Sequence, residues 1–319
     1  MTGDRLAFDL ITMGRIGVDL YPLTTGVPLE EADTFGKFLG GSPANVAVAA
    51  ARLGRRVAMI TRTGADPFGA YLRSELRGFG VDDRWVAEVA DHPTPITFCE
   101  IFPPDRFPLY FYRLPKAPDL EIAAEDLDLE AVREARVFWM TGTGLSEEPS
   151  RAATLAALEA RAKSGTTVFD LDWRPTLWRE KPGPYYERAL ALATVAVGNT
   201  EECAIATGES EPYAAARALL ATGVELAVVK RGPEGVLAVH RDGTVAEVPP
   251  VPVQVVNGLG AGDAFGGALC HGLLAGWEPE RVMRYANAAG AIVASRLACS
   301  TAMPFSHEVE EVLGRAGGV

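Results

Sequence analysis

The stretch that decides the fold lies near the C-terminus, where residues 257–268 read NGLGAGDAFGGA. A glycine-rich turn runs there directly into an apolar segment of helical period, so a helix is predicted over residues 262–275. Small side chains leave the first N–H groups of this helix bare, and a helix N-terminus with unpaired donors and a positive dipole end favours bound anions. The candidate anion hole consists of Gly260, Ala261 and Gly262.

Asp263 follows this turn, and its carboxylate is a candidate proton acceptor. Taken alone, it is equally well explained as a helix cap, and the glycines as ordinary turn residues. The stretch is neither G-x-x-x-x-G-K-[ST] nor the glycine turn that follows the first strand of a dinucleotide-binding fold. Phosphoryl transfer needs charge neutralisation and a group that takes the hydroxyl proton, and a carboxylate beside an anion hole supplies both.

The composition is that of a globular protein. The 319 residues are 48% hydrophobic, enough for one large domain or two ordinary ones, and the net charge of −12 argues against nucleic-acid binding. No apolar run approaches the roughly 20 residues that span a bilayer, and residues 1–5 lack an export signal, so the cytoplasm is the expected compartment. The cysteines lack metal-ligand spacing and are expected to be buried thiols: Cys99, Cys203, Cys270 and Cys299.

Short β-branched runs alternate with longer segments of helical period, which predicts an α/β fold around a mostly parallel sheet. Strands are expected at residues 8–13, 57–60, 137–140, 167–171, 195–197 and 226–230. Helices are expected at residues 43–53, 67–79, 149–162, 201–207, 213–221, 262–275 and 279–296. Segments 16–37 and 95–113 carry strand-like residues without a long helix, so we expect them to pair as a small sheet over a cleft. Two long surface loops are the alternative.

A second glycine-containing stretch precedes a helix near the N-terminus, where residues 40–54 read GGSPANVAVAAARLG. Gly41 permits a close backbone approach, and Asn45 in the first turn can point its amide toward a ligand or simply cap the turn. With the C-terminal stretch, it resembles the two signature regions of the ribokinase or pfkB family of carbohydrate kinases. Asn199 and Glu202 match that family's N-x-x-E, although a helix N-cap explains them too.

The resemblance covers the whole chain and implies a single ribokinase-like domain over residues 1–319, a three-layer α/β/α sandwich with a small β-sheet lid. It implies ATP-dependent transfer of the γ-phosphoryl group to a primary sugar hydroxyl, with Asp263 as the base. Magnesium would be held through water by Asn199 and Glu202. The sugar would contact Asp19, Gly41 and Asn45. The nucleotide would contact Asn199, Lys230, Arg231, Gly232, Gly235 and Asn287, of which Arg231 is otherwise a surface charge and Asn287 a helix-packing residue.

Two arginines suggest which sugar is bound. Tyr112 and Arg113 end an expected strand of the lid, and both are expected to contact the substrate. Arg174 follows a strand of the main sheet, where ligands bind in such folds, and is expected there too. Arg can clamp a carboxylate with two hydrogen bonds, so these residues indicate a sugar acid; structural ion pairs are the alternative. The resemblance favours family members that phosphorylate the 6-hydroxyl of 5-dehydro-2-deoxygluconate.

Other functions remain open at this point. Within the family they are 2-keto-3-deoxygluconate kinase, fructokinase or ribokinase activity, or a nucleoside or vitamin kinase; outside it, a non-catalytic sugar or nucleotide sensor. Relatives carry an acid where this chain has Asn257, which weakens the case for a potassium ion beside the turn. The exposed edges of the expected lid favour a homodimer formed through it.

Overall fold

The computed structural model describes residues 7–316 of the chain. Residues 1–6 and 317–319 lie outside the described residues. Residues 1–5, on which the expected compartment partly depends, are among them. Within the described part, no helix is long and apolar enough to cross a membrane. The four cysteines are free and buried, as expected.

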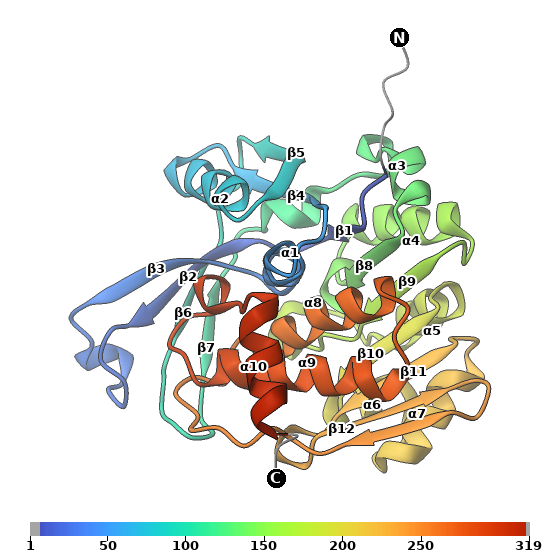
Figure 1. Cartoon of the computed structure of the whole chain (residues 1–319). Coiled ribbons are helices and arrows are strands. Elements are labelled where there is room, and N and C mark those ends of the chain that lie inside the picture. The colour runs from blue at the N-terminus through green and yellow to red at the C-terminus, as the bar shows by residue number, and fades with distance from the viewer. Residues whose placement is uncertain (1–6, 317–319) are drawn as a thin grey trace.

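The main sheet runs through the middle of the molecule (Figure 1). Its order is β13 (Val245–Val248), β12 (Val236–His240), β11 (Leu226–Lys230), β10 (Val195–Asn199), β9 (Thr166–Asp170), β8 (Val137–Thr141), β1 (Leu10–Met13), β4 (Val57–Gly64) and β5 (Val81–Val89). Neighbours from β11 to β5 are parallel, and β12 and β13 add an antiparallel edge. The predicted mostly parallel sheet is therefore confirmed.

Helices cover both faces of this sheet because its central strands are apolar on both sides. One face packs against α1 (Ser42–Arg52), α2 (Pro67–Gly78), α8 (Ala261–Leu274), α9 (Pro279–Ala294) and α10 (Ser306–Ala316). The other packs against α3 (Leu129–Glu134), α4 (Ser150–Arg161), α5 (Gly183–Leu192), α6 (Thr200–Thr207) and α7 (Pro212–Ala221). Along β8, Val137 and Trp139 belong to the first core, Phe138 and Met140 to the second.

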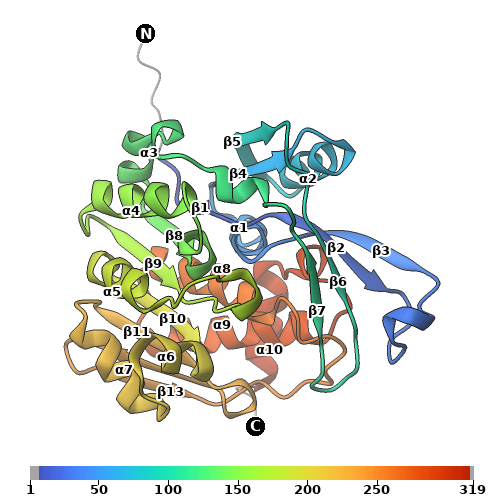
Figure 2. The ribbon, with the colours of Figure 1, turned by 180° about the vertical axis from the view of Figure 1, so that it is seen from behind.

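A second, smaller sheet projects from one side of this body in both views (Figures 1 and 2). Its order is β3 (Phe35–Gly40), β2 (Gly17–Pro22), β6 (Ile96–Cys99) and β7 (Leu109–Tyr112). Val18 in β2 lies opposite Ile96 in β6, so the two segments that interrupt the α/β alternation pair with each other. The alternative of two surface loops is wrong. We refer to β3, β2, β6 and β7 as the small sheet.

Glycines bring the starts of α1 and α8 together. A Cβ atom added to Gly267 in α8 would lie 2.4 Å from Cβ of Ala49 and 2.9 Å from the backbone N of Ala50 in α1. A Cβ atom on Gly266 would lie 2.6 Å from the Trp139 ring. Only glycine lets the two helices approach each other and the sheet this closely. Their first turns therefore meet at the carboxyl ends of the strands.

We predict that Gly267→Ala lowers the free energy of unfolding by about 1–3 kcal/mol, because the added methyl group overpacks the contact with α1. Gly78→Ala is the matched control, since Gly78 ends α2 with nothing within 4 Å of an added Cβ atom. It should leave stability unchanged or raise it by up to about 1 kcal/mol. Urea unfolding of the two variants measures both effects, and equal stabilities would contradict the packing argument.

Candidate active site

A cavity of about 360 Å³ lies at the carboxyl ends of the central strands, beneath the small sheet. Ligands bind at this edge in open α/β sheets. Most of the residues singled out from the sequence line it. They are Asp19, Gly41, Asn45, Arg113, Arg174, Asn199, Glu202, Lys230, Gly232, Gly260, Gly262 and Asp263.

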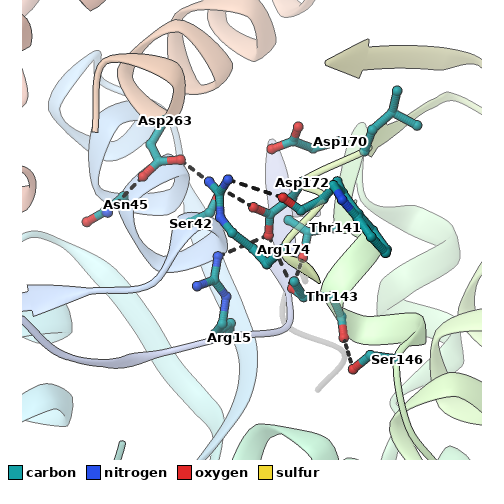
Figure 3. Close-up of polar contacts among 12 residues, drawn as sticks. Arg15, Ser42, Asn45, Thr141, Thr143, Ser146, Asp170, Asp172, Arg174 and Asp263 are labelled. Atoms are coloured by element: carbon teal, nitrogen blue, oxygen red, sulfur yellow. Dashed lines mark hydrogen bonds and ion pairs between the residues drawn. The ribbon is translucent and has the colours of Figure 1, made fainter. Parts of the chain in front are cut away.

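Asp263 lies in the first turn of α8, and both of its carboxylate oxygens accept hydrogen bonds from α1 (Figure 3). Ser42 Oγ donates to Oδ1 at 2.7 Å, and Asn45 Nδ2 donates to Oδ2 at 2.8 Å. Burial raises the pKa of Asp263, while these hydrogen bonds act to lower it. The carboxylate is thus held in one orientation at the cavity wall, with lone pairs left to accept a proton.

Ser42 was not singled out from the sequence, and Asn45 was assigned to the sugar rather than to Asp263. Ser42 opens α1 directly after Gly41, so its hydroxyl looked like that of an ordinary helix-start residue. The signal that could have identified it is its place in the second glycine-containing stretch, three residues before Asn45. Residues three apart on a helix share a face, so both point at the same partner.

The turn before Asp263 has the geometry expected of bare backbone amides. Gly260 adopts φ 80°, and a Cβ atom there would lie 2.6 Å from Sγ of Cys299, so only glycine fits. Lys230 Nζ lies 3.5 Å from where a Cβ atom on Gly262 would be, which adds a cation beside the helix N-terminus. Ala261 follows Gly260 in the turn, and its side chain does not line the cavity. An anionic group at this position would meet an ammonium and a positive helix end together.

Burial and charge both act on Lys230, which ends β11. Burial acts to lower its pKa, but the neighbouring Asp170 and Glu202 outweigh burial and raise it. Lys230 Nζ lies 3.9 Å from Asp170 Oδ1, and burial raises the pKa of this carboxyl group. The ammonium therefore remains charged at neutral pH, which suits a role beside phosphate.

Asn199 and Glu202 form a reciprocal capping box at the start of α6. Asn199 Oδ1 accepts from the backbone N–H of Glu202 at 2.8 Å, and Glu202 Oε2 accepts from that of Asn199 at 2.7 Å. The helix-cap explanation is therefore correct, and it leaves Glu202 Oε1 outside the capping box. Among residues 7–316, no three His, Cys, Asp or Glu side chains cluster as metal ligands. This donor set fits a magnesium ion held mainly by water and phosphate.

Asp19 lies in β2 and is nine-tenths buried at the cavity. Its Oδ2 accepts from Tyr21 Oη at 2.9 Å, and Tyr21 Oη in turn lies 2.8 Å from Cys299 Sγ. Burial raises the pKa of Asp19 to about 7, although Tyr21 and Arg15 act to lower it. The sequence analysis missed Tyr21, whose place two residues after Asp19 on the same strand face was the available signal.

Several predicted contacts lie elsewhere. Tyr112 is 65% exposed on the outer face of the small sheet, where its ring packs against Phe98. Side chains alternate along a strand, and Leu109 and Phe111 are the residues of β7 that face the cavity, so Tyr112 faces outward. Three residues predicted to contact the nucleotide do not line this cavity: Arg231, Gly235 and Asn287. Arg231 is paired with Glu247 at 2.7 Å, and Asn287 donates to the carbonyl of Pro249 at 3.0 Å.

The two predicted carboxylate-binding arginines are both engaged by acids. Arg113 Nη2 binds both carboxylate oxygens of Asp119, at 2.9 and 2.7 Å, and this pair is buried. Arg174 Nη2 lies 3.3 Å from Asp172 Oδ1. The sequence analysis missed a third arginine, Arg15, whose Nη2 lies 3.0 Å from Asp172 Oδ2. The sequence feature that could have identified Arg15 is its position just after the first strand, at the ligand-binding edge of the sheet.

Asn257 is fully buried before the turn. Its Nδ2 donates to the carbonyl of Leu297 at 2.7 Å, and its Oδ1 accepts from the N–H of Leu259 at 3.0 Å. The side chain therefore ties the turn to the segment that carries Cys299. The amide of Asn257 is neutral and both of its ends are engaged, so this side chain supplies no charge for a potassium ion.

Comparison with known proteins agrees with this arrangement. The model of the pfkB family carbohydrate kinases matches residues 7–305. The chain belongs to this family. A 5-dehydro-2-deoxygluconokinase from Shouchella clausii (strain KSM-K16) is 35% identical to this pfkB kinase over 312 residues, covering 96% of this chain and 95% of the relative. A 5-dehydro-2-deoxygluconokinase from Listeria monocytogenes serotype 4b (strain CLIP80459) is 33% identical, with 97% of each chain covered.

Solved structures show the same fold. A fructokinase from Xylella fastidiosa with bound ATP has a TM-score of 0.85 and 27% identity, covering 97% of this chain and 99% of that one. A protein from E. coli described as a ribokinase II, in complex with ATP and Mg²⁺, has a TM-score of 0.86 and 25% identity. The match covers 97% of this chain and 99% of that one. The ribokinase-like fold and the carbohydrate kinase class expected from the sequence are therefore confirmed.

The raised pKa of Asp19 predicts how sugar binding depends on pH. The ionised carboxylate accepts hydrogen bonds from sugar hydroxyls more strongly than the protonated acid, and with a pKa of about 7 it forms as the pH rises from 6 to 8. The KM for the acceptor sugar, measured at saturating ATP, should fall about tenfold over this range. Asp19→Asn should abolish the dependence. A wild-type KM independent of pH would show that Asp19 does not bind the sugar through its charge.

Proposed function

We propose that this pfkB kinase transfers the γ-phosphoryl group of ATP to the 6-hydroxyl of 5-dehydro-2-deoxy-D-gluconate. Two relatives that match nearly the whole chain carry the name 5-dehydro-2-deoxygluconokinase. The arginines at the cavity, Arg15 and Arg174 among them, suit an acceptor that carries a carboxylate. The observation that carries the catalytic proposal is the fixed carboxylate of Asp263 at the start of α8.

Asp263 is the base in this proposal. As the sugar hydroxyl oxygen bonds to the γ-phosphorus, the bond to the β,γ-bridging oxygen breaks, ADP leaves, and the hydroxyl proton passes to Asp263. Ser42 and Asn45 keep the carboxylate aimed at the hydroxyl. The amides of Gly260, Ala261 and Gly262 and the ammonium of Lys230 stabilise the charge on the transferred group.

The nucleotide phosphates are placed, in this proposal, against Lys230, Gly232 and the turn of α8. ATP is bound in the solved fructokinase, and ATP with Mg²⁺ in the E. coli protein. A magnesium ion neutralises phosphate charge when bound, and Asn199 and Glu202 would hold it through water. Asp19, Gly41 and Asn45 contribute the sugar side of the cavity. The engaged amide of Asn257 gives no support to a potassium ion.

Turnover on a panel of acceptors tests the proposed activity. With Mg·ATP, wild type should act best on 5-dehydro-2-deoxygluconate, more slowly on 2-keto-3-deoxygluconate, and least on fructose, ribose, adenosine and pyridoxine. Asp263→Asn should lower kcat about 100- to 10,000-fold, because the base is lost while the shape of the cavity is kept. Its KM for the sugar should change little. Preference for a neutral sugar would contradict the substrate, and near-normal turnover by Asp263→Asn would contradict the base.

We further propose that two copies associate through the outer face of the small sheet. Tyr110 and Tyr112 on this face are 46% and 65% exposed, and Leu114 just beyond it is 80% exposed. Large exposed apolar side chains gathered on one face are typical of contact surfaces. Light scattering should give the mass of two chains for wild type and the mass of one chain for Tyr112→Glu. A monomeric wild type would rule this interface out.

A further inference from the structure

Arg15 is buried at the cavity with only part of its hydrogen-bonding capacity used. It is 7% exposed and lines the cavity, and its guanidinium lies 5.7 Å from the centre of the Phe111 ring of the small sheet. Its one ion pair is to Asp172, through Nη2. Its Nε is buried and has no hydrogen-bond partner. An unpartnered buried donor on a cation is costly, so this arrangement favours an anionic acceptor entering the cavity.

Asp172 is shared between Arg15 and Arg174, as Figure 3 shows. Thr143 Oγ1 also donates to its Oδ2, at 3.2 Å. Burial acts to raise the pKa of Asp172, but Arg15 and Arg174 outweigh burial and hold it below its usual value. The trio of Arg15, Asp172 and Arg174 is therefore two cations around one anion. Counted by itself, the trio has one more positive than negative charge.

Other acids lie around this trio, and they are shared among several cations. Arg15 acts to lower the pKa values of Asp19 and Asp263 as well. Glu202 Oε1 lies 3.9 Å from Arg174 Nη1, but Glu202 also lies close enough to Lys230 to act on its pKa. The charge of Glu202 is thus divided between two cations. Arg174 Nε, like Arg15 Nε, is buried without a partner. Two adjacent guanidinium groups with unused donors fit the two oxygens of one carboxylate.

Arg113, the arginine that the sequence placed at the substrate, is satisfied within the protein. Its Nη2 contacts both oxygens of Asp119, and the side chains of the pair are 10% and 5% exposed. This ion pair is electrically balanced. Arg113 therefore stabilises the chain after β7, whereas Arg15 shares its acid, Asp172, with Arg174.

We propose that Arg15, acting with Arg174, binds the carboxylate of the sugar acid and so determines the preference for acids over neutral acceptors. Asp172 is the positioning residue that holds the two guanidinium groups side by side. The inference rests on the proposed function, because it presumes an acceptor that carries a carboxylate. It differs from the sequence-based expectation in assigning this role to Arg15 in place of Arg113.

The test compares a sugar acid with its primary amide, which has the same shape without the charge. For wild type, kcat/KM on 5-dehydro-2-deoxygluconate should exceed that on the amide by about 10- to 100-fold, the range of a charge-assisted hydrogen bond. Arg15→Gln should reduce this ratio to near one by raising KM for the acid, with KM for ATP unchanged. Arg15→Lys keeps the positive charge and is the variant more certain to fold. Its acid-to-amide ratio should lie between that of wild type and that of Arg15→Gln.

Arg161→Gln is the matched control for the loss of a buried arginine. Arg161 is fully buried and donates to the carbonyls of Val132, Ala135 and Thr166, away from the cavity. This variant should lower the melting temperature and keep the acid-to-amide ratio, which separates misfolding from lost recognition.

Three results would overturn the assignment of Arg15. In the first, the folded Arg15 variants keep the acid-to-amide ratio of wild type. In the second, Arg113→Gln loses that ratio while Arg15→Lys keeps it in full. In the third, wild type uses the acid and the amide equally well. Failure of the proposed function itself would look different, because wild type would then phosphorylate none of the sugar acids while accepting a neutral sugar.

Discussion

The pair of hydrogen bonds that Ser42 and Asn45 donate to Asp263 is the interaction on which the active site depends. It joins residues 221 and 218 positions apart in the chain, at 2.7 and 2.8 Å. Distances this short require the first turns of α1 and α8 to stay in register, and Gly266 and Gly267 make that approach possible. Packing in the core thus sets the orientation of a carboxylate at the surface of the cavity.

Burial governs the electrostatics of the same site, and the small sheet forms part of the cavity wall. Phe111 and Leu109 of β7 face the cavity, and Asp19 of β2 is buried beside them. Burial raises the pKa values of Asp19, Asp170 and Asp263 together. The same low dielectric strengthens each ion pair that forms there. Raised carboxylate pKa values and strong arginine–carboxylate pairs are therefore two results of burial at this cavity.

The sequence predicted the features that depend on local pattern. The central strands are continuous apolar runs buried on both faces, and the turn before Asp263 combines glycines with a helix start, so both could be read from neighbouring residues. Among the elements it missed are β5 and β13, the two part-exposed edge strands of the main sheet, and α5, which begins among prolines and glycines. Edge elements bury one face only, so their periodic signal is weaker.

The sequence could not show which face or which partner a side chain has, because both depend on tertiary distances. Tyr112 was expected at the substrate, but a strand alternates its side chains, so Phe111 faces the cavity and Tyr112 faces outward. Arg113 and Arg15 both lie at suitable strand ends, and only the fold shows that Asp119 neutralises the first. An arginine's chemistry is visible in a sequence, whereas its charge balance depends on acids brought near by folding. For the proposed recognition of a sugar acid, the difference that matters is that Arg113 binds both oxygens of Asp119, whereas Arg15 shares Asp172 with Arg174.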